Sequence, residues 1–238
     1  MTDQHIVSAF DQDLRELSSR LAEMGGLAER LVAESVDALV KRDTTLAQRV
    51  IASDDLIDAL QREIEEKAIL TIARRQPMAV DLREIVSALR IANDLERVGD
   101  LAKNTAKRVL ALDGEYHAQK QLRGFKHMAD MVLERLKQVL DAYGARDSAR
   151  ALDVWKRDGE IDAMYTSLFR EFLTYMMEDP RHITACIHLL FSAKNIERIG
   201  DHATNIAETI HYLVVGEPLT DERPKSDTTS FTKVSLKR

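Results

Sequence analysis

A ten-residue segment occurs twice in the chain, and this repeat constrains the fold more than any other feature of the sequence. LERVGDLAKN at residues 95–104 and IERIGDHATN at residues 196–205 share Glu, Arg, Gly, Asp, Ala and Asn at the same relative positions. A second pair of matching segments lies upstream, SDDLIDAL at residues 53–60 and RDGEIDAM at residues 157–164. Because the matching segments follow each other in the same order, we interpret the chain as a duplicated unit.

The spacing of apolar and small residues indicates that this unit is helical. Such residues recur at intervals of three and four, which place them on one face of an α-helix. In the first half they are Ile85, Ala88, Ala92, Leu95, Gly99, Ala102, Ala106 and Val109, and in the second half they are Leu122, Phe125, Ala129, Val132, Leu136, Val139 and Tyr143. Aromatic residues make up only 5% of the chain, which favours helices over sheets as the elements that bury its apolar surface. We therefore predict an all-α fold.

Caps, glycines and prolines predict where the helices begin and end. The six expected helices run from near His5 to Arg42, from Thr44 to Arg75, from after Pro77 to near Leu112, from near Leu122 to Gly144, from Ser148 to Glu178 and from Pro180 to Gly216. The duplication then divides the chain into two related three-helix units, residues 1–112 and 113–215. Residues 216–238 contain little apolar surface to offset the entropy of ordering, so we predict a flexible C-terminal tail.

Charge and composition exclude several classes of function. The formal net charge is −6 and the isoelectric point is near 5.7, so no excess of Lys and Arg is present for binding nucleic acid. No apolar run is long enough to span a bilayer, and the N-terminus lacks the features of a signal peptide, which predicts a cytoplasmic protein without membrane insertion. The single cysteine, Cys186, lies in an apolar run and is expected to be a buried thiol rather than a reactive one.

Paired carboxylates inside the repeats are the candidate functional residues. Each pair is separated by four positions and so projects from one helix face. The first half contains Asp54, Asp58, Glu96 and Asp100, and the second half contains Asp158, Asp162, Glu197 and Asp201. If the second and third helices of each half are antiparallel neighbours, four carboxylates converge in each half. Like charges at that proximity raise one another's pKa unless protons, arginines or cations compensate them.

Two interpretations of these carboxylates remain open. Arg97 and Arg198 lie within the repeats, and their guanidinium groups would form surface ion pairs of little energetic value. The alternative is a metal site, for which all-oxygen ligands favour a hard ion such as Mg²⁺, Mn²⁺, Ca²⁺ or iron. Gly99 and Gly200 occupy matching positions inside the helices, and both close helix packing and a functional requirement account for the missing Cβ.

At these motifs the sequence resembles the PhoU family of bacterial phosphate-transport regulators. The resemblance covers about residues 5–215, and its most specific parts are PMAVDLREIVSALRIANDLERVGDLAKN and AKNIERIGDHATNIAE. It implies two three-helix bundles and carboxylate pairs that bind iron or other divalent cations. It also implies repression of phosphate-starvation signalling through contacts with a phosphate ABC transporter ATPase and a membrane sensor histidine kinase. By position it assigns one metal site to Asp54, Asp58, Glu96 and Asp100, and the other to Asp158, Asp162, Glu197 and Asp201.

Two other classes of function compete with a regulatory metal-binding adaptor. A ferritin-like di-metal oxidase also builds carboxylate sites in a helical bundle, but it needs Glu-x-x-His on two helices. Here only Glu208 and His211 fit that pattern, and no nucleotide-binding or nucleophile motif is present, so we do not expect an enzyme. The second alternative is a metal-independent helical adaptor. The helix faces with small residues also permit a homodimer.

Overall fold

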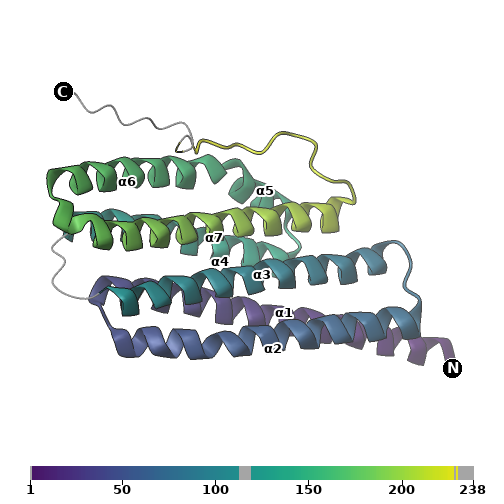
Figure 1. Cartoon of the computed structure of the whole chain (residues 1–238). Coiled ribbons are helices and arrows are strands. Elements are labelled where there is room, and N and C mark those ends of the chain that lie inside the picture. Colours follow the sequence, from purple (N-terminus) through teal and green to yellow (C-terminus); the bar gives the residue numbers. More distant parts are fainter. Residues whose placement is uncertain (1, 113–118, 228, 230–238) are drawn as a thin grey trace.

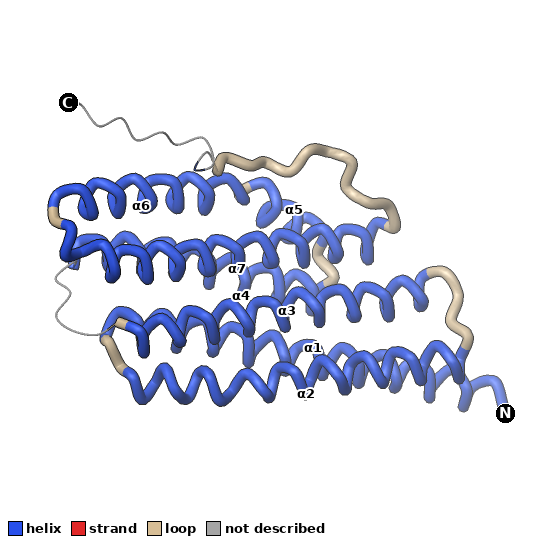
Figure 2. Tube along the Cα trace, in the orientation of Figure 1, coloured by secondary structure: helices blue, strands red, loops and turns tan. Residues whose placement is uncertain are grey.

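The computed structural model describes residues 2–112, 119–227 and 229, and for residues 2–9 and 119–121 it describes the backbone alone. Within this part of the chain every regular element is helical (Figure 1 and Figure 2). The elements are α1 (Thr2–Lys41), α2 (Thr44–Arg75), α3 (Val80–Ala111), α4 (Gln119–Ala145), α5 (Ser148–Lys156), α6 (Asp158–Glu178), the 3₁₀ helix η1 (Pro180–His182) and α7 (Ile183–Val215). The predicted all-α class is confirmed.

The helices form two bundles that lie side by side (Figure 1). Helices α1, α2 and α3 pack against one another in the first bundle, and α4, α5 and α6 pack against α7 in the second. The bundles meet where α3 lies along α7 and α1 contacts α4. The two tandem three-helix units expected from the repeat are therefore present, with α5 and α6 together in the place of one helix.

Local sequence signals account for several helix ends. The Asp43 side chain accepts a hydrogen bond of 2.9 Å from the backbone N–H of Leu46 and caps α2. Asp147 caps α5 in the same way through the N–H of Arg150, at 3.0 Å. The α7 helix ends at Gly216, whose φ of 92° lies in the left-handed region that favours glycine at a helix C-terminus.

The fifth predicted helix, expected to run without interruption to Glu178, is broken at Arg157. The backbone N–H of Arg157 bonds to the carbonyl of Val154, and the N–H of Glu160 bonds to the carbonyl of Arg157. Each of these bonds spans three residues, so the chain tightens here into a 3₁₀-like turn before α6 begins at Asp158. The Asp158-Gly159 pair lies inside this turn and is a turn signal that the sequence analysis did not use.

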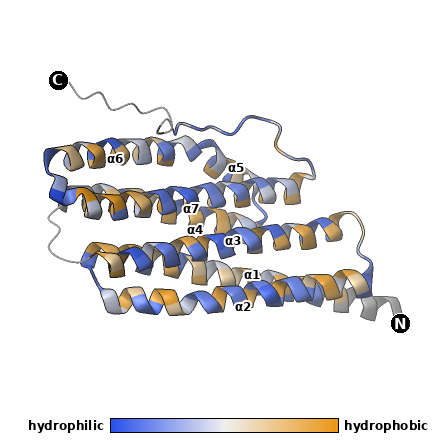
Figure 3. Cartoon of the chain, in the orientation of Figure 1, coloured by the Kyte–Doolittle hydropathy of each residue, from blue (hydrophilic) through white to orange (hydrophobic). Residues whose placement is uncertain are grey.

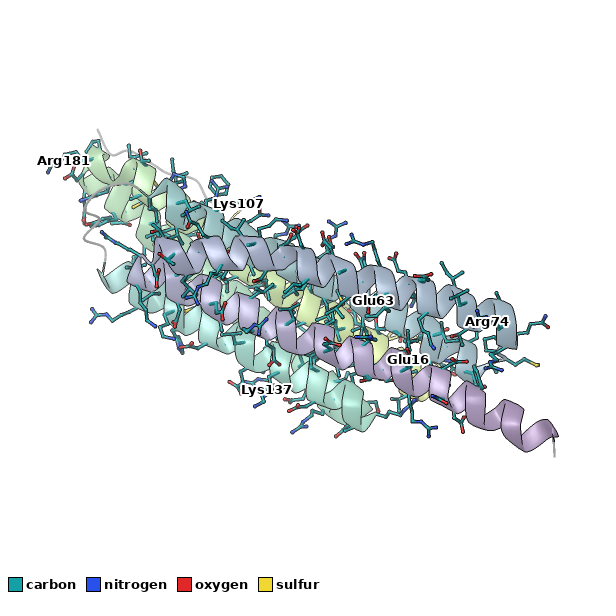
Figure 4. The ribbon with its side chains drawn as sticks, turned by 90° about the horizontal axis from the view of Figure 1, so that it is seen from below. Glu16, Glu63, Arg74, Lys107, Lys137 and Arg181 are labelled. Carbon is teal, nitrogen blue, oxygen red and sulfur yellow. The ribbon has the colours of Figure 1, made fainter. Side chains whose placement is uncertain are left out.

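One apolar core runs through both bundles. The small and apolar residues that define the predicted helix face of α3 are all buried. Figure 3 shows apolar and polar residues alternating along the helices, as expected for helices that bury one side. Figure 4 shows labelled charged side chains spread along the molecule, from Arg181 near one end to Arg74 near the other. Cys186 is fully buried in this core, as predicted.

Some predicted boundaries fall outside the described residues. The turn expected at the middle of the chain includes residues 113–118, which the structure does not describe, so the boundary between residues 112 and 113 stays a prediction. Residues 217–227, which we call the C-terminal arm, leave α7 and run back along α5 toward the start of α6 (Figure 1). The flexibility expected of residues 216–238 also stays a prediction.

Candidate metal centres

A glycine contact brings the carboxylate-bearing helices of the first bundle together. A Cβ added to Gly99 on α3 would lie 2.7 Å from Cδ1 of Ile57 on α2, which is closer than van der Waals contact allows. The missing side chain therefore lets α2 and α3 approach at this level. Asp58 follows Ile57 and Asp100 follows Gly99, so this contact fixes the position of one carboxylate on each helix.

Lys103 connects the two helices of this first cluster. Its ammonium group donates hydrogen bonds to Asp54 on α2 and to Asp100 on α3, the latter at 3.0 Å. The Asp54 side chain is only 5% exposed, and Lys103 is the cation that pairs with it. The hydrogen bond from Lys103 to Asp54 is the main cause of a pKa for Lys103 well above its usual value.

Glu96 lies within electrostatic reach of the other three carboxylates. Burial raises the pKa of Glu96, Arg97 offsets part of this effect, and Asp100, Asp58 and Asp54 raise the pKa further. Oxygen Oε2 of Glu96 is buried and accepts no hydrogen bond from any residue that the structure describes. A buried carboxylate oxygen without a donor is costly, and a cation would compensate it.

The structure adds one carboxylate that the sequence analysis missed. Asp54, Asp55 and Asp58 each offer an oxygen within 4.8 Å of the others, which is close enough for shared coordination of one ion. Asp55 is exposed, so it lies on the solvent side of the cluster. Its signal was the consecutive pair of aspartates in SDDLIDAL, of which only the first was selected.

The second bundle repeats the arrangement between α6 and α7. A Cβ on Gly200 would lie 2.9 Å from Cδ1 of Ile161, the counterpart of Ile57. Asp162 and Asp201 follow these two residues, as their counterparts do in the first bundle. Glycine at the two matching positions is therefore explained by close helix packing, which also positions the adjacent carboxylates.

Glu197 is one of three deeply buried acids in the second cluster. The residue is 3% exposed, and burial raises its pKa despite a hydrogen bond of 2.8 Å from Lys194 to Oε1. Asp201 and Asp162 raise the pKa of Glu197 further, so these carboxylates interact. Its other oxygen, Oε2, has no hydrogen-bond donor among the described residues, as in Glu96.

Asp158 and Asp162 complete this cluster from α6. The hydroxyl of Thr204 donates to Asp158 at 2.8 Å, and Arg223 from the C-terminal arm donates to both oxygens of the same side chain. Burial raises the pKa of Asp162, the backbone N–H of Ser226 offsets part of this effect, and Asp158 raises it further. The carboxylates of each predicted set interact electrostatically, but among the described residues only Asp54, Asp55 and Asp58 bring three ligand oxygens within 4.8 Å of one another. Metal coordination by the eight predicted residues stays a prediction.

Two other polar residues of α7, His202 and Glu208, contact neighbouring helices. His202 pairs through Nδ1 with Asp94 of α3 at 2.8 Å, which links the two bundles. Glu208, the acid of the single Glu-x-x-His pattern, accepts a hydrogen bond of 2.8 Å from the indole N–H of Trp155. That contact gives Glu208 a structural role. A di-metal oxidase requires Glu-x-x-His on two helices, and neither His202 nor Glu208 supplies a second copy of it.

The chain has no helix long and apolar enough to cross a bilayer within the part that the structure describes.

Comparison with known proteins places these features in one family. The family model described as PhoU domain matches residues 21–109 and 125–210, one segment in each half. The phosphate-specific transport system accessory protein PhoU homolog of Rhizobium meliloti is 61% identical over 230 residues, which cover 97% of each chain. The homolog of the same name in Caulobacter vibrioides is 53% identical, over 95% of this chain and 99% of its own.

Solved structures show the same similarity in three dimensions. The crystal structure of PhoU from Pseudomonas aeruginosa matches with a TM-score of 0.82 and 40% identity, over 87% of this chain and all of its own. The phosphate transport system regulatory protein PhoU from Streptococcus pneumoniae matches with a TM-score of 0.82 and 30% identity, over 88% of this chain and 99% of its own.

Proposed function

Because the chain belongs to the PhoU family, we propose that it is a regulatory accessory protein of phosphate uptake, with a cation site in each bundle. The observation that carries the regulatory part is the similarity along nearly the whole chain to proteins named as accessory to the phosphate-specific transport system. The chain also shares its fold with solved PhoU structures from Pseudomonas aeruginosa and Streptococcus pneumoniae.

The cation sites are supported by two buried carboxylate oxygens without a hydrogen-bond donor among the described residues, Oε2 of Glu96 and Oε2 of Glu197; the first lies 3.4 Å from the Arg97 guanidinium. Asp54, Asp58, Glu96 and Asp100 would hold an ion in the first bundle, and Asp158, Asp162, Glu197 and Asp201 would hold one in the second. The donor set is entirely oxygen, which suits Mg²⁺, Mn²⁺, Ca²⁺ or iron. A bound ion neutralises the repulsion between the acids, so that α2 stays fixed against α3 and α6 against α7.

The proposed partners are a phosphate ABC transporter ATPase and a sensor histidine kinase, which the protein would contact in the cytoplasm, alone or as a homodimer. Exposed apolar side chains favour a role in protein contacts. Met78, in the turn that precedes α3, is 79% exposed, and Val80, the first residue of α3, is 57% exposed. The protein would hold the kinase in its repressing state when phosphate is plentiful, and it would perform no chemistry itself.

A phosphate-responsive reporter tests this function in a strain that lacks the protein. Wild type is expected to restore repression in high phosphate, and Glu96→Gln/Asp100→Asn is expected to restore it only in part. Asp130→Asn/Glu134→Gln is the matched control, because it changes two exposed carboxylates with the same spacing on α4. Normal repression in the deletion strain refutes the regulatory function. Full repression by the first variant favours a metal-independent adaptor.

A further inference from the structure

The C-terminal arm lies against the second carboxylate cluster. After α7 the chain reverses at Gly216, where a Cβ would lie 2.5 Å from the Arg83 guanidinium, so glycine suits this turn both in space and in its positive φ. The arm then runs back along the second bundle (Figure 1), and Figure 3 shows that it is mostly hydrophilic. Its packing therefore depends on polar contacts more than on apolar burial.

Arg223 of the arm binds two of the four acids directly. Its guanidinium forms a two-pronged contact with Asp158, with donor to acceptor distances of 2.7 and 2.9 Å. The same group donates to Oδ1 of Asp201 at 2.7 Å and to Oδ1 of Asn205 at 3.1 Å. The Arg223 side chain is 18% exposed, so it is inserted between α6 and α7 rather than lying on the surface.

Neighbouring arm residues engage the rest of the cluster. Lys225 donates to Asp201 at 3.1 Å, and the backbone N–H of Ser226 donates to Asp162 at 2.9 Å. Lys194, the partner of Glu197, also donates to Asp227 of the arm at 3.1 Å. Three of the four acids are thus bound by the arm itself, and the fourth is connected to it through one lysine.

The two halves of the repeat differ at the positions that make this possible. Lys103, which bridges two acids in the first bundle, corresponds to Thr204 in the second, so α7 carries no cation at the position equivalent to Lys103. Arg223 supplies the missing positive charge from outside the repeat and bridges the equivalent acids, Asp158 and Asp201. Lys103 is fixed on its helix, whereas Arg223 lies on a segment without regular structure.

The second difference makes room for the arm. Asp55 of the first cluster corresponds to Gly159 in the second. A Cβ at Gly159 would lie 2.9 Å from Oγ of Ser226 and 3.8 Å from the carbonyl oxygen of Pro224. The Ser226 hydroxyl donates to the Gly159 carbonyl at 2.6 Å. A larger side chain at residue 159 would therefore occupy the space that the arm takes.

We propose that the C-terminal arm is a displaceable internal occupant of the second carboxylate cluster, with Arg223 and Lys225 taking the place of a divalent cation. This inference rests on the proposed cation sites. A divalent ion and the Arg223 guanidinium need the same oxygens of Asp158 and Asp201, so the two are mutually exclusive. Ion binding at the second cluster releases the arm, whereas the first cluster binds ions without such a change. Release of the arm would thereby change the protein surface when the second cluster binds an ion.

Titration with Mn²⁺ of the metal-stripped full chain tests the competition. The Asp54→Asn/Asp58→Asn background removes two of the three close carboxylates of the first cluster, so that the second cluster is the proposed site that remains intact. In this background Arg223→Gln/Lys225→Gln is expected to tighten Mn²⁺ binding by about tenfold, as follows if the arm occupies the cluster roughly nine-tenths of the time. Arg123→Gln/Lys126→Gln removes the same charges from exposed positions on α4 and controls for net charge.

Gly159→Leu releases the arm while leaving every charge in place, and it is expected to tighten binding to a similar extent. Release of the arm is measured in the wild-type protein by tryptic cleavage between Lys225 and Ser226. The bound arm resists this cleavage, because the Lys225 side chain is bound to Asp201 and the backbone N–H of Ser226 is bound to Asp162. Saturating Mn²⁺ is expected to accelerate this cleavage roughly tenfold, with an unstructured peptide as the control for trypsin itself.

The results separate this inference from the proposed sites. In the Glu197→Gln/Asp201→Asn background, the Mn²⁺ affinity of the first cluster is expected to be unchanged by the arm substitutions. Equal affinity of the second cluster with and without the arm residues, or no binding there in any variant, overturns the arm as competitor. The arm is also ruled out as competitor if Arg223→Gln/Lys225→Gln tightens Mn²⁺ binding and Gly159→Leu does not. If Mn²⁺ binds in neither background, the proposed cation sites are overturned as well.

Discussion

The close approach of α2 and α3 at Gly99 leads to a quantitative prediction for Gly99→Ala. Alanine is preferred over glycine inside a helix by about 1 kcal/mol. The new Cβ, however, would lie 2.7 Å from Cδ1 and 3.3 Å from Cγ2 of Ile57, which is fully buried and cannot move freely. Overpacking of this kind costs about 1–3 kcal/mol. We therefore expect a net loss of about 1 kcal/mol in the free energy of unfolding.

Gly26→Ala provides the matched control on α1. Gly26 also lies inside a helix, but nothing lies within 4 Å of a Cβ added there. This variant should gain the full propensity term, so the two substitutions should differ by about 2 kcal/mol. Urea unfolding followed by circular dichroism measures both values, provided that the dependence on urea concentration is unchanged.

Ile57→Val identifies the cause, because it removes the Cδ1 atom that the new Cβ meets. In the wild-type background the substitution should cost about 1 kcal/mol, and after Gly99→Ala it should cost much less. If Gly99→Ala is as stabilising as Gly26→Ala, or if Ile57→Val costs the same in both backgrounds, the glycine does not serve close packing. Gly200→Ala should behave like Gly99→Ala, with a smaller loss because its nearest contact is 2.9 Å.

Three further predictions concern charge and backbone. Lys103→Met should destabilise the metal-free protein by about 1–3 kcal/mol, since it leaves the buried Asp54 without its partner. Lys126→Met, at an exposed ion pair with Asp130, should change stability by less than about 0.5 kcal/mol, and chemical denaturation in a chelator compares the two. Burial raises the pKa of Glu96 and of Glu197, so the folded protein binds more protons than the unfolded chain and loses stability as pH rises above the usual glutamate range. Glu96→Gln/Glu197→Gln should therefore gain stability over wild type as pH rises from about 5 to 7 in metal-free buffer, and a constant difference between the two melting profiles contradicts this. Gly216→Ala should cost about 1–2 kcal/mol because its φ is 92°, and it should also accelerate tryptic cleavage after Lys225, whereas unchanged cleavage would mean that the turn does not hold the arm.

The sequence by itself determined the helices and the candidate acids. Spacing of three and four residues is a property of consecutive positions, so the buried face of α3 can be identified without knowing what covers it. The capping residue Asp43 and the terminal Gly216 act within one turn of their own helix, and both ends were predicted for that reason. The duplicated motifs also indicated that acids from two helices would converge in each half.

Only the tertiary structure decided what surrounds those acids. The sequence left the purpose of Gly99 and Gly200 open, because the isoleucines that need the space lie on another helix. The bridging contact of Lys103 has no local signature, since Asp54 lies 49 positions away in the chain. Arg223 comes from a segment that composition assigns to a flexible tail, yet it binds Asp158 at a separation of 65 positions. Ion pairs form according to distance in space, which helix periodicity does not encode. Two clusters with nearly the same sequence are therefore paired with different side chains, Lys103 in the first and Arg223 in the second.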